Sequence, residues 1–595
     1  MDVVHYYNKL NQHFASEPRG SSIQVTMQEL EDIWECTRRN AQLLVQKMKE
    51  QGLIDWQSGL GRGNTSRLVL VADAQELLLD KAKELALKGH VGEAFGLLHA
   101  HTDPLAESHF SDWLTGQFGA QKASDHKDIL RFPFYRPVPD LEPLFVIRRT
   151  ETHLIRQILN TLVEFDTAGH VIKPGLAHYW ESDHEYTEWT FYLRKGVLFH
   201  HGKVMTAEDV QFTFQRFGQL NPPDWFMANV ARIEVLSDIS VRFHLSEPNA
   251  LFLHLLASER FSIVPKDLDR IAATRDIRRM PVGTGPFVMK ENSDNGMILE
   301  ANERYFQGRP MMDRIEIWVW PNYLEHLKPD RLQERDTQVL YFEPTGKKKT
   351  GTLLTRLEEG STYMTFNLSR DGILHDVKLR EAIHLAINRE QMVKELGGKR
   401  EQPSSGFNPY DHDEAYGRGG ELMLARACLA ESAYRGETLT LYTYEMTSNE
   451  LDTEWIRRAC EDIGVKVEVH VMPIRELTNP SVLKQADMIY AGEVLGNEPS
   501  VSLIEMYRSH YGYIRNHLDG AAKDGVDRAL SEVLAEPDYT VRRILLRRIE
   551  DQLKRDHHLL FMYHSIHIIG HDQSLGGITL DTWGKINYKD VWVKR

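Results

Sequence analysis

Side chains that can read DNA bases are concentrated in one short stretch of the sequence. The polar and basic positions of this stretch are Thr37, Arg38, Arg39, Gln42 and Gln46. Arginine can donate two hydrogen bonds to the major-groove edge of guanine, and glutamine can pair with the edge of adenine. We therefore predict that this stretch contacts bases in the major groove of double-stranded DNA.

The apolar residues of the same stretch predict the helix that carries these side chains. They recur at the spacing of one helical face and are Ala41, Leu44, Val45 and Met48. A face of this kind packs on a core, so the DNA-reading side chains lie on the opposite, outward face. Thr37 is expected to cap the start of the helix with its hydroxyl, and Gly52 to follow its last turn.

Two further helices are predicted before this one. Residues 1–16 carry an apolar stripe of helical period, which would pack on the DNA-reading pair. Thr26, followed three residues later by Glu29, is a capping box and marks the start of the second helix. Its pattern ends near Glu35, so a tight turn leads into the helix that starts at about Arg38. Two helices in this arrangement form a helix-turn-helix.

A glycine-rich hairpin is predicted after the helices. Residues 53–56 and 67–71 have the apolar pattern of strands, with a turn rich in glycine between them. Arg62, Asn64 and Arg67 would then lie on a wing, within reach of DNA phosphates or of the minor groove. Each feature alone would also suit a small helical domain with a solvated basic face. Their order favours a winged helix-turn-helix.

The charge distribution supports a single small DNA-binding unit. The formal net charge of the chain is −15, which argues against general coating of nucleic acid. Residues 36–71 nevertheless carry six Lys or Arg and two Asp or Glu, whereas residues 1–35 carry two and six. A local basic stripe on an acidic protein is the footprint expected of one DNA-binding module.

Length and composition indicate a multidomain protein of ordinary soluble type. At about 150 residues per domain, 595 residues suggest three or four units. The sequence has no apolar run long enough to span a membrane and no secretory signal pattern near its start. The three cysteines, Cys36, Cys428 and Cys460, are too few and too scattered for a disulfide framework. These features predict a cytoplasmic protein.

The remainder of the chain divides into a helical connector and a long α/β region. Residues 73–125 are predicted to be mostly helical with a polar end, and residues 126–595 have a mixed α/β pattern. Short strands are expected at 129–135, 189–193, 233–235, 241–245, 315–320 and 338–342.

Two stretches of the α/β region give more specific predictions. Strands at 439–444 and 465–471 flank a helix at about 449–463, which predicts a parallel pair joined by a crossover. That helix is expected to bury Leu451, Trp455, Ile456 and Cys460. One long helix is expected over residues 525–553.

A series of collinear motifs runs from residue 175 to residue 389. They are Gly175–Ala177, Trp189–His200, Thr206–Val210, Gly283–Phe287, Asn302–Tyr305, Gly308–Pro310, Tyr363–Asn367, Lys378–Ala382 and Ala386–Arg389. Together they resemble the extracellular solute-binding proteins of peptide and nickel ABC transporters, which form family 5. The likeness weakens after about residue 400. It implies a two-lobed, periplasmic-binding-protein-like (type II) α/β domain over 126–595, with a second lobe at about 370–555.

The N-terminal stretch adds a second resemblance. Its matching positions are Thr37–Arg39, Met48, Gly52, Trp56, Gly61–Gly63 and Ser66–Leu68. A winged helix in front of a solute-binding domain resembles the SgrR-family transcriptional regulators. The resemblance implies a regulator that binds operator DNA and senses a small molecule of the peptide, sugar or sugar-phosphate class. Control of transport-related genes would follow by analogy. The alternative is a cytoplasmic solute-binding protein whose N-terminal domain binds another protein.

Particular residues are predicted to form the ligand cleft and the hinge. Clefts combine aromatic walls with a few polar anchors, and this favours Trp225, Tyr363, Asn367 and Tyr410 as ligand contacts. The crossovers between the lobes are expected near 363–367 and 559–564. One winged helix has a small DNA footprint, so we expect either a homodimer or additional DNA contact from the connector at 73–118.

Metal and enzyme chemistry receive little support. Zinc could use histidines such as His200 with His201, or His564 with His567, but their spacing is loose. Residues 564 and 567 would also point to opposite faces of a strand. The serines lack a nucleophile-elbow motif. We therefore expect no metal, no cofactor and no catalytic site, although a metal- or sugar-phosphate-responsive enzyme is a third alternative.

Overall fold

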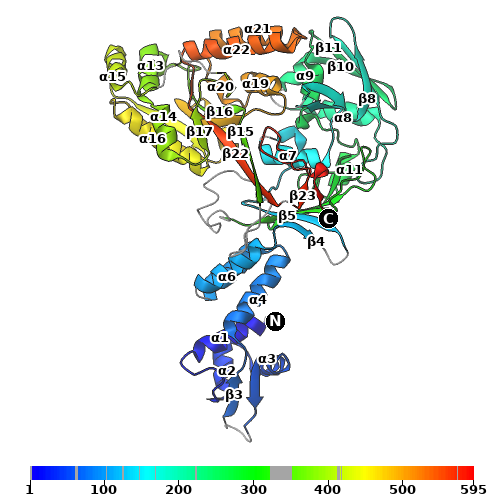
Figure 1. Cartoon of the computed structure of the whole chain (residues 1–595), viewed down its shortest axis with the longest axis vertical. Coiled ribbons are helices and arrows are strands. Elements are labelled where there is room, and N and C mark those ends of the chain that lie inside the picture. Colours follow the sequence, from blue (N-terminus) through cyan, green and yellow to red (C-terminus); the bar gives the residue numbers. More distant parts are fainter. Residues whose placement is uncertain are drawn as a thin grey trace.

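The computed structural model describes most of the chain as a multidomain protein with a narrow N-terminal end and two broad lobes (Figure 1). A winged-helix unit, which we call the reader, lies at one extremity, and three helices connect it to the lobes. This confirms the predicted fold class. The described residues are 3–59, 65–101, 104–122, 126–146, 148–167, 169–220, 224–321, 351–411, 416, 419–572 and 574–594.

The reader is an α+β unit with one apolar core. Its elements are α1 (Val3–His13), β1 (Ile23–Val25), α2 (Met27–Trp34), α3 (Arg38–Glu50), β2 (Ile54–Gln57) and β3 (Ser66–Leu70). The sheet order is β1-β3-β2, and both pairings are antiparallel. Strand β1 was not predicted, because three residues are too short to show an alternating pattern.

Local sequence fixes the geometry of the helix-turn-helix. The capping box is confirmed: Glu29 N donates to Thr26 Oγ1 at 3.1 Å, and Thr26 N donates to Glu29 Oε2 at 3.4 Å. Glu35 takes the left-handed conformation, with φ of 49°, and thereby turns the chain sharply into α3. The four apolar residues predicted to face the core from α3 are all buried.

The connector consists of three helices, and Asp73 caps the first of them by accepting bonds from Gln75 N and Glu76 N. The helices are α4 (Ala74–Leu87), α5 (Val91–His101) and α6 (Pro104–Thr115). The predicted helical character is confirmed. Strand β4 (Gly119–Lys122), which follows, pairs with β5 (Asp128–Phe134) and so belongs to the sheet of the first lobe.

Lobe 1 is built on two sheets. The first has the order β12-β13-β14-β5-β4, with β14 and β5 parallel, and the second has the order β10-β11-β9-β8. The further elements are α7 (Arg149–Ile158), β6 (Val163–Asp166), β7 (Val171–Pro174), β8 (Ala177–Ser182), β9 (Glu188–Leu193), α8 (Ala207–Gly218), α9 (Trp225–Asn229), β10 (Val230–Ser237), β11 (Ser240–Leu245), α10 (Phe252–Leu256), α11 (Leu268–Ala272), β12 (Phe287–Asn292), β13 (Gly296–Ala301) and β14 (Arg314–Val319).

Lobe 2 has a five-stranded sheet of order β19-β18-β20-β16-β21, covered by helices. Its elements are β16 (Gly360–Phe366), α13 (Val377–Ala386), α14 (Arg389–Leu396), β17 (Arg400–Pro403), α15 (Leu422–Glu431), β18 (Thr438–Tyr444), α16 (Thr447–Glu461), β19 (Lys466–Met472), α17 (Ile474–Leu477), α18 (Pro480–Leu483), β20 (Met488–Val494), α19 (Pro499–Arg508), α20 (Tyr513–His517), α21 (Gly520–Ala535), α22 (Tyr539–Arg555) and β21 (Leu559–Phe561). The predicted parallel pair is β18 with β19.

The chain enters lobe 2 through β15 (Gly351–Leu357) and leaves it through β22 (Tyr563–Asp572), which pair antiparallel. Of the crossovers expected at 363–367 and 559–564, the first lies in β16 and the start of the second in β21, both inside the lobe 2 sheet, and only residues 563–564 belong to the crossover strand β22. After β22 the chain returns to lobe 1 through β23 (Leu575–Gly576) and β24 (Trp592–Val593). Figure 1 shows β15 and β22 running between the two lobes.

Three expectations on lobe 2 and the hinge region are corrected or left open. Helix α16 buries Ile456 and Cys460 as predicted, but Leu451 is 41% exposed and Asp452 is fully buried. The single helix expected over 525–553 is two helices, because the chain breaks at the proline between α21 and α22. The strand expected at 338–342 lies outside the described residues.

A buried ionic network explains why α16 turns a carboxylate inward. Asp452 accepts from Arg400 Nε at 2.7 Å and from the hydroxyls of Tyr490 and Tyr563 at 2.6 Å each. Arg400 is 2% exposed at its side chain. The four residues come from β17, α16, β20 and β22, so the network fixes the crossover strand to lobe 2.

Removing this carboxylate is expected to destabilise lobe 2. In Asp452→Ala the Arg400 charge stays buried without its partner, which costs on the order of 3–5 kcal/mol. Calorimetry should show the transition of lobe 2 at a lower temperature. Asp462→Ala, which removes an exposed carboxylate at the end of the same helix, is the control. Equal melting of the two variants would contradict the role given to the network.

Candidate functional site

The outward face of α3 presents the predicted base-reading side chains. Arg38, Arg39, Gln42 and Gln46 are all exposed, and the buried face lies on the opposite side of the helix. Thr37 occupies the N-cap position, but its hydroxyl makes no capping hydrogen bond, so the expected cap is wrong. The hydroxyl is therefore not used by the helix.

The basic side chains of this face differ in their contacts. Arg38 lies 3.8 Å from Glu31, at the outer limit of an ion pair, while Arg39 forms no ion pair among the described residues. Gln46 donates to Glu50 at 2.9 Å. Arg67 is exposed on β3, the described part of the wing, whereas Arg62 and Asn64 lie outside the described residues. Contact of these residues with DNA stays a prediction.

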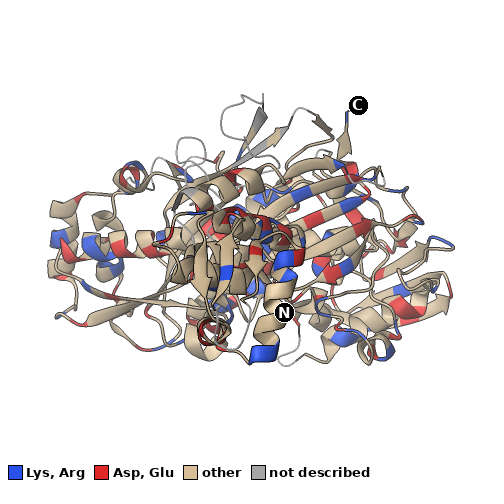
Figure 2. Cartoon of the chain, turned by 90° about the horizontal axis from the view of Figure 1, so that it is seen from below, with Lys and Arg blue, Asp and Glu red and all other residues tan. Residues whose placement is uncertain are grey.

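Charge on the rest of the molecule is mixed. Seen from the reader end, positions of Lys and Arg are interspersed with positions of Asp and Glu along the ribbons of the lobes (Figure 2). A duplex held by α3 would therefore meet alternating charge on the lobes, and we expect the electrostatic contribution to binding to come mainly from the reader.

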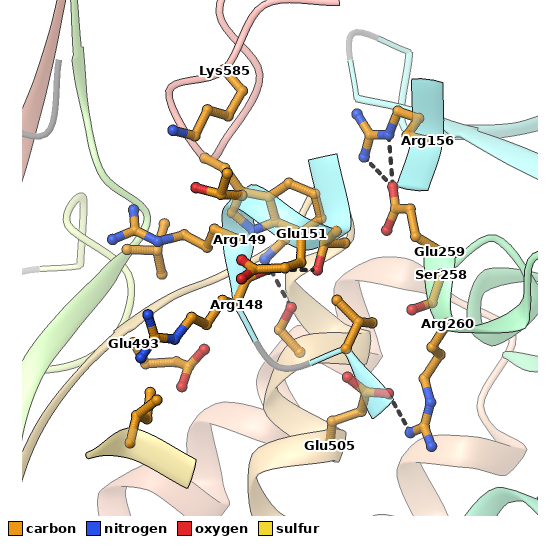
Figure 3. A pocket seen from close by; sticks show the side chains of 18 of the residues that line it. Arg148, Arg149, Glu151, Arg156, Ser258, Glu259, Arg260, Glu493, Glu505 and Lys585 are labelled. Carbon is orange, nitrogen blue, oxygen red and sulfur yellow. Dashed lines mark hydrogen bonds and ion pairs between the residues drawn. The ribbon is translucent and has the colours of Figure 1, made fainter. Parts of the chain in front are cut away.

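A large cleft lies between the lobes. Its volume is about 2010 Å³, and it is lined by residues of lobe 1, of lobe 2 and of residues 581–589, which we call the C-terminal segment. Figure 3 shows charged side chains from α7 and from lobe 2 facing one another across it. Beside the cleft, apolar residues of both lobes share one core, and Ala250 N donates to Leu534 O at 2.8 Å.

Several ion pairs connect lobe 1 with lobe 2 or with the crossover. Arg148 pairs with Glu445 at 2.8 Å, and Arg260 pairs with Glu505 at 2.9 Å. Arg149 reaches Glu358, directly after β15, at 3.2 Å. Although burial raises the pKa of Glu358, His567 and Arg149 hold it well below its usual value. Cations of lobe 1 are thus neutralised by carboxylates on the other side of the cleft.

Glu493 stands out among the lining residues. Burial raises the pKa of this carboxyl to about 7, against the opposing effect of Arg149. The side chain lines the cleft at the end of β20 and is partly accessible from it. Tyr363, Tyr444 and Tyr513 line the same cleft. A carboxyl group among aromatic rings can hold a ligand cation when it is ionised, or donate a hydrogen bond to a ligand acceptor when it is protonated.

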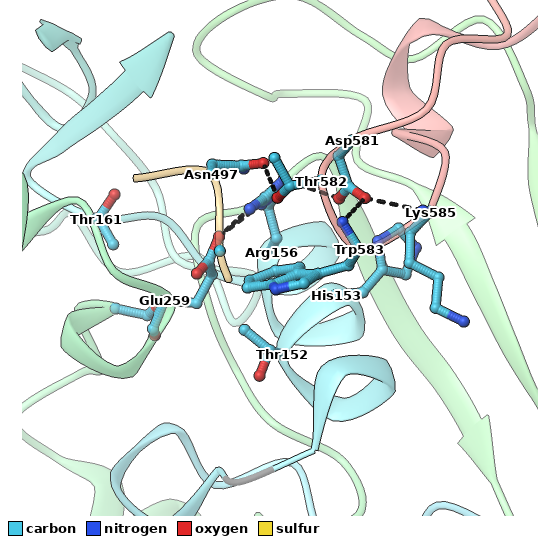
Figure 4. A network of polar contacts seen from close by, with 12 residues as sticks. Thr152, His153, Arg156, Thr161, Glu259, Asn497, Asp581, Thr582, Trp583 and Lys585 are labelled. Atoms are coloured by element: carbon cyan, nitrogen blue, oxygen red, sulfur yellow. Dashed lines mark hydrogen bonds and ion pairs between the residues drawn. The ribbon is translucent and has the colours of Figure 1, made fainter. Parts of the chain in front are cut away.

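A second polar network lies where three segments meet (Figure 4). Arg156 of α7 forms an ion pair with Glu259 and another, at 3.4 Å, with Asp581 of the C-terminal segment. The hydroxyl of Thr582 and the side-chain amide of Asn497 are 3.0 Å apart. The C-terminal segment therefore touches both lobes.

Two of the four predicted ligand residues lie at the cleft. Trp225 and Tyr363 line it, and Trp225 Nε1 is buried without a hydrogen-bond partner among the described residues. Asn367 is 3% exposed and donates to the carbonyls of Lys484 and Ala486, and Tyr410 is 69% exposed; neither lines this cleft. Ligand contact by any of the four stays a prediction.

Several cleft residues could not be predicted from the sequence. Arg148 and Glu493 come from elements far apart in the chain, and Trp583 and Lys585 reach the cleft because the C-terminal segment returns to lobe 1. In this segment residues 586 and 588 are buried in the lobe 1 core, which leaves the alternate positions facing the cleft. That alternation was visible in the sequence, but its partner surface was not.

The histidines considered for metal binding have structural contacts. His200 Nε2 lies 3.1 Å from Gly285 O, and Gly283 N donates to His200 Nδ1 at 3.4 Å. His567 Nε2 lies 2.5 Å from Glu358, while His564 Nδ1 lies 2.6 Å from Gly360 O. Within the described part of the chain no three His, Cys, Asp or Glu side chains gather as a metal site.

Comparison with known proteins identifies both halves of the chain. Residues 171–513 match the middle region of the bacterial extracellular solute-binding proteins of family 5, and residues 3–120 match the N-terminal domain of the sugar transport-related sRNA regulators. The second match covers the reader and the connector together. The chain belongs to the SgrR family of transcriptional regulators.

Full-length relatives share this architecture. The uncharacterized protein YhjP of Bacillus subtilis is 30% identical over 610 residues, covering 100% of both chains. The HTH-type transcriptional regulator SgrR of Yersinia enterocolitica is 26% identical over 577 residues, covering 96% of each. The periplasmic binding protein DppA of Helicobacter pylori, solved with the peptide STSA, has 21% identity and a TM-score of 0.64 over 78% of this chain and 98% of its own.

These comparisons support the two-lobed fold. The ligand site has to be inferred from the side chains of this chain. At 21% identity the comparison with DppA shows the fold alone. Within the described residues, we find no helix with the length and apolar character needed to cross a membrane.

Loss of one exposed arginine is expected to weaken DNA binding. Arg39→Ala removes a possible bidentate contact to guanine, worth about 1–3 kcal/mol, and should relax specificity at one base pair. Fluorescence anisotropy on a duplex from the upstream region of the protein's own gene measures this. Arg304→Ala removes an exposed arginine of lobe 1 and is the matched control. Equal DNA affinities of the two variants would contradict the prediction that α3 lies at the DNA interface.

The pKa of Glu493 predicts a pH-dependent stability difference. A carboxyl whose pKa is raised to about 7 by folding favours the folded state when protonated, and this contribution is lost as the pH rises toward 7. Glu493→Gln removes the ionisation. Its melting temperature relative to the wild type should therefore rise between pH 5 and pH 7 and stay constant above. Glu450→Gln, at an exposed carboxyl of α16, should show no such trend.

Proposed function

We propose that this protein is a cytoplasmic transcriptional regulator in which a ligand in the interlobe cleft changes the binding of the reader to operator DNA. The observation that carries the proposal is the presence, in one chain, of an exposed DNA-reading helix and a large cleft lined by two lobes. The SgrR relative is named as an HTH-type transcriptional regulator, which supports the same role.

The chemistry of the cleft favours a polar small molecule. Cations from lobe 1 pair with carboxylates from lobe 2 across it, and several aromatic rings line the same cleft. Such a lining suits a peptide, a sugar or a sugar phosphate, each of which presents several hydrogen-bonding groups. The peptide bound to the related fold of DppA supports the first of these classes.

Closure of the lobes provides the switch. A two-lobed binding domain moves about its hinge, and a ligand stabilises the closed state by its difference in affinity for the two states. The shared apolar core holds the lobes together even before a ligand binds, and the interlobe ion pairs neutralise the charges that face one another. A ligand then needs to supply only the remaining difference. We propose that the domain binds its ligand without transforming it and controls genes of transport.

A DNA-binding titration tests the proposal. The wild type is titrated with the labelled upstream duplex alone, with the peptide STSA and with a hexose phosphate. One of the two compounds should shift the DNA affinity on the order of 5–150-fold. The affinity should also fall steeply with salt, as phosphate contacts require. An N-terminal domain that binds another protein would instead show no DNA affinity that responds to Arg39→Ala.

The small size of the reader leads us to expect that two copies of the chain bind DNA together. One small winged helix buries too little DNA surface for tight specific binding, so we propose a homodimer on two half-sites. A labelled duplex cut to one half-site should bind more weakly than the full site. Equal binding would indicate that a single reader is sufficient.

A further inference from the structure

Four aromatic residues join the connector to lobe 1. Phe95 of α5 stacks on Trp320 with ring centroids 5.4 Å apart and an interplanar angle of 21°. Phe118, between α6 and β4, stacks on the same ring at 6.0 Å and 17° and meets Trp318 edge-on at 5.8 Å. We call Phe95, Phe118, Trp318 and Trp320 the aromatic clamp. Phe118, Trp318 and Trp320 are each 5% exposed or less.

The aromatic clamp lies on the main sheet of lobe 1. Trp318 belongs to β14, and Trp320 follows its end. Strand β14 pairs with β5, which pairs with β4, and β4 directly follows Phe118. The connector is therefore fixed to this sheet twice, through the chain at β4 and through ring stacking at β14. His90 adds a third contact at 3.1 Å to Asn295, next to β13.

The connector is packed just as closely on the reader. Ala74, the first residue of α4, belongs to the apolar core of the reader. The hydroxyl of Tyr7 donates to Ala72 O at 2.8 Å, and Arg19 forms an ion pair at 2.8 Å with Asp73, the cap of α4. Leu78, one turn farther along α4, lies in the same core as the aromatic clamp. Packing thus continues without a break from the reader to lobe 1.

Lobe 2 is attached in a different way. No residue of lobe 2 contributes to the core that contains the aromatic clamp, as far as the chain is described. Its covalent attachment runs through β15 and β22, and its other contacts with lobe 1 lie at the cleft and beside it. Those contacts are the ones that opening of the cleft would release.

We propose that the aromatic clamp makes the reader, the connector and lobe 1 one rigid body, relative to which lobe 2 moves. Stacked, desolvated rings add to the area that they bury, so separating the connector from the sheet is costly. The role of this rigid body in regulation rests on the function proposed above. In that function, the ligand changes the position of lobe 2 relative to the reader. The mechanical content is independent of DNA and ligand. The clamp residues act as positioning residues for the reader.

Single-molecule energy transfer between pairs of labels tests this on the full chain. One label is placed on the reader at Gln12→Cys, and the other on lobe 1 at His178→Cys or on lobe 2 at Lys466→Cys, all exposed positions. The native cysteines are replaced by alanine. In the wild type we expect one narrow reader–lobe 1 distance distribution and a broader reader–lobe 2 distribution. Equal widths would overturn the assignment of lobe 2 as the moving part.

The clamp variants localise the effect. Trp320→Leu and Phe95→Leu keep an apolar side chain but lose the stack, so each should broaden the reader–lobe 1 distribution. Trp113→Leu is the control, because Trp113 stacks on Phe110 inside the connector, at 5.7 Å. An unchanged distribution in both clamp variants, or equal broadening in the control, would overturn the role of the clamp.

Anisotropy on the upstream duplex separates this result from the proposed function. A reader that is intact but loosely attached keeps its DNA affinity, so Trp320→Leu should bind DNA as the wild type does while its reader–lobe 1 distribution broadens. A loss of affinity equal to that of Arg39→Ala would show that the substitution damages the reader itself and would overturn the inference. If the wild type does not bind the duplex, the proposed function is contradicted. The distance distributions would still test the role of the clamp.

Discussion

The structure depends on how its two lobes are joined. Within the described residues the chain passes between them through β15 and β22, which pair with each other along most of their length. A pair of strands deforms more easily than a packed core, so relative motion concentrates there. The pair is nevertheless fixed at both ends: Tyr563 is bound to the buried Asp452 of lobe 2, and Glu358 pairs with Arg149 of lobe 1. The lobes can therefore move only along a restricted path.

The charges that line the cleft determine the free energy of moving the lobes along this path. The cations of the cleft are already paired with carboxylates across it, so closing the lobes without a ligand buries pairs and not single charges. A buried pair is close to neutral in its net contribution, because the loss of hydration offsets the attraction. A ligand that brings its own charges can displace such pairs at low cost. If the cleft binds the proposed ligand, this arrangement allows ligands of different charge, and the aromatic walls would select the shape of the ligand.

Local features could be predicted from the sequence, and features that need distant partners could not. The capping box at Thr26, the buried face of α3 and the parallel pair β18–β19 follow from short-range patterns and agree with the structure. Helix α16 shows the limit. Its apolar stripe suggested that Leu451 is buried, whereas the residue that is buried is Asp452, because Arg400, Tyr490 and Tyr563 arrive from three other elements to bind it. The cleft has the same character, since its lining comes from three parts of the chain.

The aromatic clamp also joins residues that are far apart in the sequence. Through it, we propose, the reader is held in a fixed position on lobe 1. Trp320 lies where the described chain leaves lobe 1, so one end of the passage toward lobe 2 is held by the helices that carry the reader. A change in the angle between the lobes must be absorbed either at β15 and β22 or at the clamp. The clamp is a buried ring stack on a five-stranded sheet, whereas β15 and β22 form a pair of strands only. We therefore expect the strand pair to deform before the clamp does. In the proposed regulator the reader would then keep its orientation on lobe 1, and lobe 2 alone would change its position relative to DNA or to the proposed second copy of the chain.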